Sequence, residues 1–359
     1  MIPGMKIFII AEAGVNHNGS LDMARELVEV AKAAGADAVK FQTFRAEKMI
    51  SRLAPKAEYQ IATTGDTQSQ LEMVQRLELD AAAHAQLRSH CRDRHIEFMS
   101  TPFDSESVDL LVNLGVARLK IPSGEITNAP LLLKIARTGL PLIMSTGMAT
   151  LGEIETALGV LAFGLQGRSD RPSRSAFQQA LSAAGALGLL QERVALLHCT
   201  TEYPAPVEEV NLRAMDTLRT AFLLPVGYSD HTPGIAVAIG AAARGARIIE
   251  KHFTLDRSLP GPDHRASLEP GELAEMVRGI REVEMALGSG LKLPGGSELK
   301  NRVVARKSLV ASRFINKGEP FNEENITIKR PGSGLSPLYY WEWLGKFADR
   351  DYLPDEVLD

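Results

Sequence analysis

Short apolar runs separated by helix-like patterns are the feature that most constrains this fold. Eight runs of four or five residues recur along the first 253 residues, and most are preceded by a helical pattern. Runs this short and this continuous are typical of parallel strands buried on both faces. Eight such strands alternating with helices predict a (β/α)8 barrel, although the count alone also fits an open α/β sheet. The runs are Ile7–Ala11, Ala38–Phe41, Ile96–Ser100, Ala117–Ile121, Leu142–Ser145, Val194–His198, Pro225–Tyr228 and Ile248–His252.

Two segments interrupt the alternation of strands and helices, and the last part of the chain does not follow it. The polar stretch Arg45–Leu79 is predicted to be an elaborated loop over the site, and residues 163–190 an insertion that is partly mobile and partly helical. A helical pattern over Gly271–Leu287 is expected to end the barrel domain, 1–288, at Gly288. Glycine, proline and serine then mark a linker, 289–300, before a small domain, 301–359.

Length and composition fit this organisation and exclude several classes of protein. The 359 residues accommodate a barrel of roughly 250 residues plus a small domain. A net charge of −4 does not predict binding to nucleic acid or to a membrane surface. Cys91 and Cys199 form no metal-type pair and favour a reducing cytoplasm. We find no signal peptide, no membrane span and no nucleotide-binding glycine motif.

Lysines follow two of the predicted strands at the end where barrel enzymes carry their catalytic groups. Lys40 and Lys120 come from different strands, with Ser123 and Ser145 nearby in the pattern. A lysine at the end of a buried strand is costly unless it meets an anion. Together these side chains are expected to surround a phosphate and a carboxylate. The alternative is that each lysine pairs with a structural carboxylate.

Histidines follow the last two predicted strands. His231 and His252 could bind one divalent cation through their imidazole nitrogens and leave positions open for water and substrate. The alternative is that each is a hydrogen-bonded core residue. Glu12 precedes an Asn/His/Gly turn that could also be a helix cap. Asp263, in a proline-rich loop, is expected to point into the barrel mouth unless the loop is a plain helix-leading turn.

At these residues the chain resembles the sialic acid synthase family along nearly all its length. The tail around residues 329–334 is similar to the family's antifreeze-like (SAF) domain. Residues 124–128, 200–206 and 262–270, with the insertion, resemble bacterial legionaminic acid synthases most. The matching family stretches, in order and nearly one per strand, are Ala11–Gly19, Gly35–Gln42, Ser100–Phe103, Lys120–Glu125, Ser145–Met148, Gly227–Thr232 and Glu250–Thr254.

The resemblance implies a domain-swapped homodimer and a set of ligand contacts. A Mn²⁺-type ion, with Mg²⁺ and Co²⁺ as alternatives, would lie on His231 and His252, and the partner's Arg330 would reach the N-acyl group of the sugar. Thr201 stands where better-known members have an asparagine, so one phosphate contact differs. Phosphoenolpyruvate would be held by Lys40, Thr101, Lys120, Ser123 and Ser145, and the sugar by Glu12, Gln42, Glu125, Tyr203 and Asp263.

The implied activity is the condensation of phosphoenolpyruvate with an open-chain N-acetylated amino sugar. Phosphate leaves by C–O cleavage, with Glu125 as the base and Glu12 and Lys120 as the other catalytic residues. We expect 2,4-diacetamido-2,4,6-trideoxymannose as the sugar and N,N'-diacetyllegionaminate as the product. The alternatives are an N-acetylneuraminate synthase using N-acetylmannosamine, a pseudaminate synthase, a metal-dependent aldolase, and a carbohydrate-binding or ice-binding protein.

Overall fold

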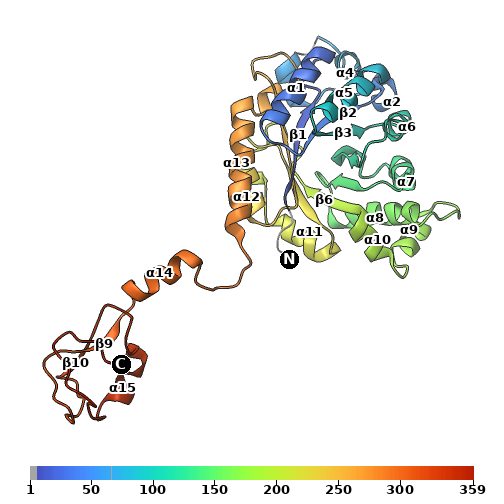
Figure 1. The fold of residues 1–359 in the computed structure, drawn as a ribbon. Coiled ribbons are helices and arrows are strands. Elements are labelled where there is room, and N and C mark those ends of the chain that lie inside the picture. The colour runs from blue at the N-terminus through green and yellow to red at the C-terminus, as the bar shows by residue number, and fades with distance from the viewer. Residues whose placement is uncertain (1–5, 66) are drawn as a thin grey trace. The chain divides into compact units, whose positions relative to one another are not determined.

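The chain divides into two compact units at Gly288 in a computed structural model that describes residues 6–65 and 67–359 (Figure 1). The first unit is an eight-stranded parallel barrel and the second contains a two-stranded antiparallel sheet. Among the described residues, no helix combines the length and the apolar character that a membrane span requires.

The barrel strands pair in the order β3-β2-β1-β8-β7-β6-β5-β4. The strands at the two ends of this order, β3 and β4, contact each other without a ladder of hydrogen bonds, so the barrel is nearly closed. The expected (β/α)8 architecture is therefore confirmed. The strands are β1 Phe8–Gly14, β2 Ala38–Thr43, β3 Glu97–Pro102, β4 Leu119–Ile121, β5 Leu142–Ser145, β6 Val194–His198, β7 Val226–Asp230 and β8 Ile248–His252.

Helices connect the strands and bury apolar faces against them. In the first, the Ser20 side chain accepts a hydrogen bond from the backbone N–H of Met23 and caps the helix. Ala24, Leu27 and Val28 of this helix are fully buried. The connecting helices are α1 Leu21–Ala33, α5 Ala81–Asp93, α6 Ser105–Leu114, α7 Ala129–Arg137, α8 Leu151–Leu165, α11 Ala214–Phe222, α12 Ala236–Ala243 and α13 Pro270–Leu287.

Side chains inside the barrel form an apolar floor beneath a polar layer. Gly227 leaves room in the floor, because a Cβ atom there would lie 2.3 Å from the carbonyl oxygen of Ile248. Alternate residues of a strand point to the same side, so the residues two positions after the floor residues also face inward. The floor residues are Ile10, Ala38, Met99, Ile143, Leu197 and Ile248, and those two positions later are Glu12, Lys40, Thr101, Ser145, Cys199 and Glu250.

The two interrupting segments are more helical than the sequence suggests. Instead of one long loop, residues 45–79 contain α2 Ala46–Met49, α3 Glu58–Thr64 and α4 Gln70–Gln75, anchored on a small apolar cluster that includes Phe44 and Val74. Residues 163–190 contain the end of α8, then α9 Arg174–Leu181 and most of α10 Ala186–Arg193, where Phe177 packs edge-on against Phe163.

The small unit has its own core and begins with a helix. Helix α14, Gly296–Ala305, starts inside the predicted linker because the Glu298 side chain accepts a hydrogen bond from the Gly295 N–H and caps it. Strands β9, Ser308–Ala311, and β10, Ile326–Lys329, pair antiparallel. The last helix is α15, Tyr340–Trp343. The buried core residues are Leu309, Ala311, Ile315, Phe321, Ile326, Ala348, Tyr352 and Leu358.

Candidate active site

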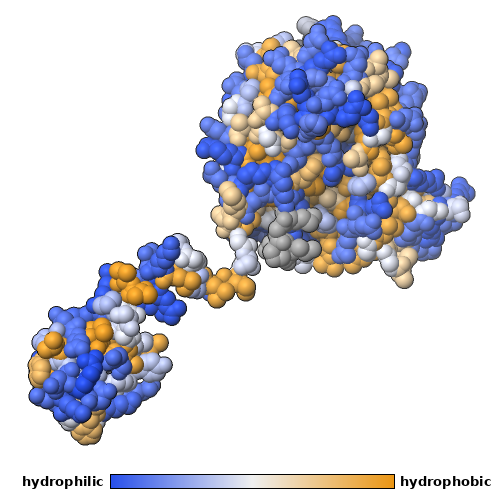
Figure 2. All heavy atoms as spheres, in the orientation of Figure 1, coloured by the Kyte–Doolittle hydropathy of each residue, from blue (hydrophilic) through white to orange (hydrophobic). Residues whose placement is uncertain are grey.

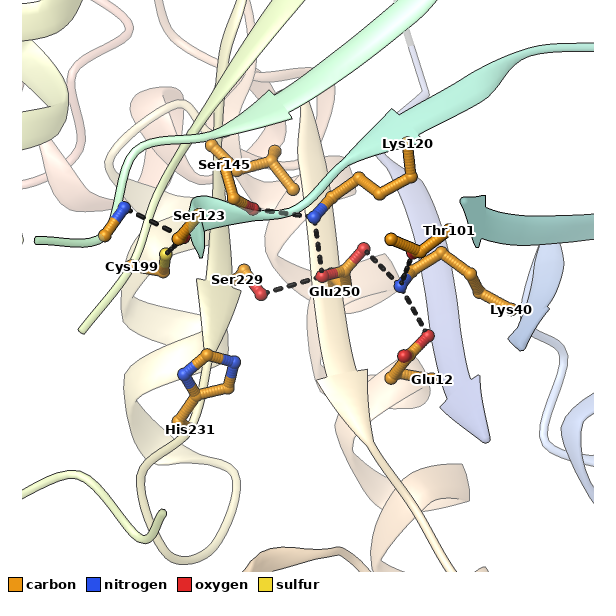
Figure 3. Close-up of polar contacts among 12 residues, drawn as sticks. Glu12, Lys40, Thr101, Lys120, Ser123, Ser145, Cys199, Ser229, His231 and Glu250 are labelled. Atoms are coloured by element: carbon orange, nitrogen blue, oxygen red, sulfur yellow. Dashed lines mark hydrogen bonds and ion pairs between the residues drawn. The ribbon is translucent and has the colours of Figure 1, made fainter. Parts of the chain in front are cut away.

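Four buried charged side chains meet at the carboxyl end of the barrel (Figure 3). The Lys40 Nζ lies 2.7 Å from Glu12 Oε2 and 3.6 Å from Glu250 Oε2. The Lys120 Nζ lies 3.3 Å from Glu250 Oε1. Glu250 therefore bridges the two lysines. We call these four residues the charge cluster; it contains two positive and two negative groups.

Hydroxyl groups from β3, β5 and β7 form hydrogen bonds to the charge cluster. Lys40 donates a hydrogen bond to Thr101 Oγ1 at 2.9 Å, and Lys120 donates one to Ser145 Oγ at 2.7 Å. Ser229 Oγ donates to Glu250 Oε1 at 2.8 Å. The structure thus brings Lys40, Lys120, Thr101 and Ser145 together as predicted. Both lysines nevertheless pair with carboxylates here, which is the alternative that the sequence left open.

The pKa values of the two carboxyl groups in the charge cluster are shifted in opposite directions. Burial raises the pKa of Glu12, and the attraction of Lys40 offsets this only in part. Burial also opposes ionisation of Glu250, but Lys120 and Lys40 outweigh it and lower its pKa. Environments that separate two carboxyl pKa values assign different roles to them. Glu12 is suited to exchange a proton, whereas Glu250 stays ionised.

Ser123 and Cys199 form a second group of polar side chains in the site, close to each other (Figure 3). The Ser123 Oγ accepts a hydrogen bond from the backbone N–H of Gly147 at 3.0 Å and lies 3.1 Å from Cys199 Sγ. A Cβ on Gly147 would lie 2.2 Å from Thr201 Oγ1, so only glycine allows this approach. The Thr201 hydroxyl is buried and has no hydrogen-bond partner in the described part of the chain. It can therefore hydrogen-bond to a bound ligand.

His231 and His252 lie together, with ring centroids 5.5 Å apart. The His231 Nδ1 lies 2.6 Å from the carbonyl oxygen of Thr200, which can only accept, so Nδ1 carries the proton and Nε2 the free lone pair. Burial lowers the pKa of His231 to about 4 and also lowers that of His252. Both rings are therefore neutral, which is the form that binds metal ions.

The two histidines fit a divalent ion that keeps open coordination positions. The His252 Nδ1 is buried without a hydrogen-bond partner within the described residues and lies 3.9 Å from Asp263 Oδ2. The carbonyl bond on His231 is the kind of contact that orients a ligand histidine. No cluster of three or more histidine, cysteine or acidic side chains with metal-binding geometry occurs in residues 6–65 and 67–359.

Aromatic rings form a wall next to the histidines. The Tyr203 ring lies 4.2 Å from the His231 ring, centroid to centroid, and the Tyr59 ring of α3 lies 5.2 Å from that of Tyr203. Burial and then the nearby Asp263 carboxylate raise the pKa of Tyr59. Burial raises the pKa of Asp263 itself to about 6. Residues 45–79 thus contribute to the mouth through Tyr59, which the sequence analysis did not single out.

Three other predicted site residues have different surroundings. Gln42 Nε2 donates a long hydrogen bond of 3.5 Å to Glu12 Oε1. The half-buried Glu125 accepts a hydrogen bond of 2.6 Å from Asn128 Nδ2, on the 3₁₀ turn Ser123–Glu125, rather than from a lysine of the charge cluster. Arg330 is an exposed residue of the small unit, where its Nε donates to the Ala305 carbonyl oxygen at 3.1 Å.

The main residue that the sequence analysis missed is Glu250. The sequence marks it only as part of a stretch that matches the family, although it contacts both lysines of the charge cluster. Strand alternation carries a signal that finds it: Ile248, Glu250 and His252 must share one face of β8. The same alternation pairs Ser229 with His231 on β7.

Comparison with known proteins agrees with this geometry. Residues 27–292 match the NeuB family and residues 306–359 match the SAF domain. The chain belongs to the NeuB family. The resemblance to the sialic acid synthase family inferred from the sequence is therefore confirmed, as is the SAF domain at the end of the chain.

Two relatives and one solved structure illustrate the similarity. The N,N'-diacetyllegionaminic acid synthase of Campylobacter jejuni is 52% identical over 98% of this chain and 99% of its own length. The enzyme of the same name from Legionella pneumophila is 47% identical over 93% and 88%. The structure of the N-acetylneuraminic acid (sialic acid) synthetase of Leptospira borgpetersenii, in complex with citrate, has a TM-score of 0.67 and 34% identity and covers 82% of this chain and 90% of its own.

Proposed function

We propose that this chain condenses phosphoenolpyruvate with open-chain 2,4-diacetamido-2,4,6-trideoxymannose to form N,N'-diacetyllegionaminate and phosphate. The observation that carries the proposal is the charge cluster beside two neutral histidines at the barrel mouth. The two legionaminic acid synthases at 52% and 47% identity support the choice of sugar over N-acetylmannosamine, because the sialic acid synthetase structure is at 34%.

Phosphoenolpyruvate would bind by replacing the carboxylates as partners of the two lysines. Lys40 and Lys120 are held in place by Thr101 and Ser145, so both ammonium groups face the same space. Ser123 and Thr201 provide two more hydroxyl groups, both beside Gly147. Fixed charges and donors in a buried site stabilise the phosphate from binding to departure.

The sugar would lie between the charge cluster and the aromatic wall. A divalent ion, with Mn²⁺ favoured over Mg²⁺ and Co²⁺, would be held by His231 and His252 and would polarise the aldehyde as a Lewis acid. Tyr203 packs on His231 and would bound the space for the sugar, and Asp263 and Gln42 would accept or donate hydrogen bonds to its hydroxyl and amide groups.

The reaction then forms one carbon–carbon bond and needs a base that accepts one proton from water. C3 of phosphoenolpyruvate attacks the aldehyde carbon, and the aldehyde oxygen takes up a proton to become a hydroxyl group. Water adds to C2 and loses its proton to a carboxylate, for which Glu125 is our candidate and Glu12 the nearby alternative. The tetrahedral intermediate loses phosphate as its C–O bond breaks, and the C2 hydroxyl proton is released to leave a ketone.

Replacing Glu125 with glutamine is expected to lower kcat by about 10²–10⁴-fold, the range for removal of a general base. Phosphoenolpyruvate affinity, measured by calorimetry, should remain within about twofold, because Glu125 contacts Asn128 and not the lysines. Glu12→Gln is the matched comparison. If Glu125→Gln leaves kcat unchanged while Glu12→Gln lowers it, the base is Glu12.

We also propose a domain-swapped homodimer in which the partner's small domain supplies Arg330 to the sugar. Apolar side chains exposed on the small unit support an assembly beyond one chain: Leu291, Leu293 and Trp341 are 73%, 70% and 78% exposed, and Figure 2 shows hydrophobic residues on the surface of this unit. Exposed apolar area of this kind marks interaction sites.

Arg330→Ala is expected to raise the KM for the sugar by about tenfold or more, which corresponds to the loss of one charged hydrogen bond. The KM for phosphoenolpyruvate should not change. Arg313→Ala is the control, since Arg313 is an exposed arginine of the same unit paired with Glu319 at 2.7 Å. Equal sugar KM values for Arg330→Ala and the parent chain would remove Arg330 from the site.

The function is tested by phosphate release from phosphoenolpyruvate and Mn²⁺ with each of the two sugars. Faster release with the diacetamido sugar supports the proposal, and faster release with N-acetylmannosamine makes the chain an N-acetylneuraminate synthase. Carbon–carbon bond formation without phosphate release would instead indicate an aldolase. We place the reaction in the cytoplasm, where phosphoenolpyruvate is made; Cys91 and Cys199 are buried free thiols, as expected there.

A further inference from the structure

A buried ion pair lies beside the two histidines, on the outer face of β7 and β8, away from the barrel interior. Asp230 and Lys251 expose no side-chain surface, and Lys251 Nζ lies 3.0 Å from Asp230 Oδ2. They are partners in the register of β7 and β8, and the ladder between these strands ends with them. Each directly precedes a histidine, so His231 and His252 extend from the ends of the two strands that this pair joins.

Further hydrogen bonds connect the pair to the backbone on the other side of His231. Asp230 Oδ1 accepts from the Thr232 backbone N–H at 2.9 Å and from Thr232 Oγ1 at 2.8 Å. Lys251 also donates to the Thr232 carbonyl oxygen. Asp230 and Thr232, the residues on either side of His231 in the chain, thus both contact Lys251, which directly precedes His252.

Stability alone is a weak reason for placing charges at this position. Removing two charges from water costs several kcal/mol per ion, and replacing a buried ion pair by apolar groups of similar volume is often neutral or stabilising. What an ion pair with several directed contacts provides, and an apolar pair does not, is a fixed separation and orientation of the chain segments that it joins.

We propose that the Asp230–Lys251 pair is a positioning device that sets the separation and orientation of His231 and His252 for a divalent ion. This inference rests on the proposed metal site. Asp230 and Lys251 lie between the strands and the helices, and their side chains do not reach the mouth of the barrel. The pair acts on the reaction only through the two imidazoles.

The test is the double variant Asp230→Asn/Lys251→Met in the full chain. It removes both charges together, keeps the side-chain volumes similar, and leaves an amide oxygen that still accepts from Thr232, so only the tie to β8 is lost. Mn²⁺ affinity without substrates is measured by electron paramagnetic resonance of the free ion. We expect the Kd to rise about 10–100-fold, as for other groups that orient metal ligands, with phosphoenolpyruvate affinity by calorimetry unchanged.

Glu97→Gln/Arg118→Met is the matched control. It removes another ion pair, 2.7 Å between Arg118 Nε and Glu97 Oε1, and it should leave the Mn²⁺ Kd unchanged. This pair joins the first residue of β3 to the residue that precedes β4, at the amino ends of the strands and away from the histidines. Thr232→Val, which removes only one hydroxyl bond, provides a milder variant if the double variant does not fold, and should raise the Kd severalfold. A folded double variant, or failing that Thr232→Val, with the parental Mn²⁺ Kd overturns the positioning role alone, whereas a parent chain that binds no Mn²⁺ overturns the metal site as well.

Discussion

Lys120→Met is expected to lower kcat/KM for phosphoenolpyruvate by about 10²–10³-fold, the effect of removing one donor that stabilises charge in a buried site. The methionine keeps most of the side-chain length but removes the ammonium group that contacts Glu250 and Ser145. Glu250 would then have Lys40 as its remaining cation. Steady-state kinetics and calorimetry with phosphoenolpyruvate measure the two expected losses, in turnover and in binding.

Lys134→Met is the control for this experiment. Lys134 is a partly exposed lysine on α7, where it pairs with Asp109 at 2.6 Å, and its replacement should leave both constants unchanged. If Lys120→Met bound phosphoenolpyruvate as tightly as the parent chain, the pairing with Glu250 would be structural and the anion would bind elsewhere.

His252→Ala is expected to remove metal-dependent turnover, with kcat lowered by about 10³-fold or more, because the proposed ion would lose one of its two imidazole ligands. Chelation of the parent chain should cause the same loss, and added Mn²⁺ should restore the parent chain but not the variant. Phosphate release with excess sugar and phosphoenolpyruvate is the measurement.

His90→Ala provides the comparison for the metal experiment. His90 lies at the surface of α5 next to Glu29, so its replacement should leave turnover and its response to Mn²⁺ unchanged. Full activity of the parent chain after exhaustive chelation would contradict the role of His231 and His252 as metal ligands.

The sequence predicted the barrel strands well because each is buried on both faces. The four apolar residues that open Val194–His198 stand out in the sequence, and the bounds of this run agree with β6. Helical segments within 45–79 were missed because only one apolar side of a short helix, such as Met73 and Val74 in α4, faces the cluster beneath it.

Partners within the site could not be predicted in the same way. Lys40 contacts Glu250 across the barrel interior, from strands that are not hydrogen-bonded to each other, and the sequence does not give that geometry. Alternation along β8 would have placed Glu250 on the inner face, but not its two lysine contacts. The position of Glu125 on a 3₁₀ turn, bonded to Asn128, likewise depends on how β4 ends.

The balance of the charge cluster has a consequence for ligand choice. Because Glu12 and Glu250 already contact the two lysines, an incoming anion must compete with acidic side chains that are attached to the protein and therefore always close by. Chloride or bicarbonate, with one charge each, can replace only a fraction of those contacts. A molecule that carries a phosphate and a carboxylate on one short frame can replace them together. Glu12 and Glu250 thus compete with common cellular anions for the two lysines and keep those anions out of the site.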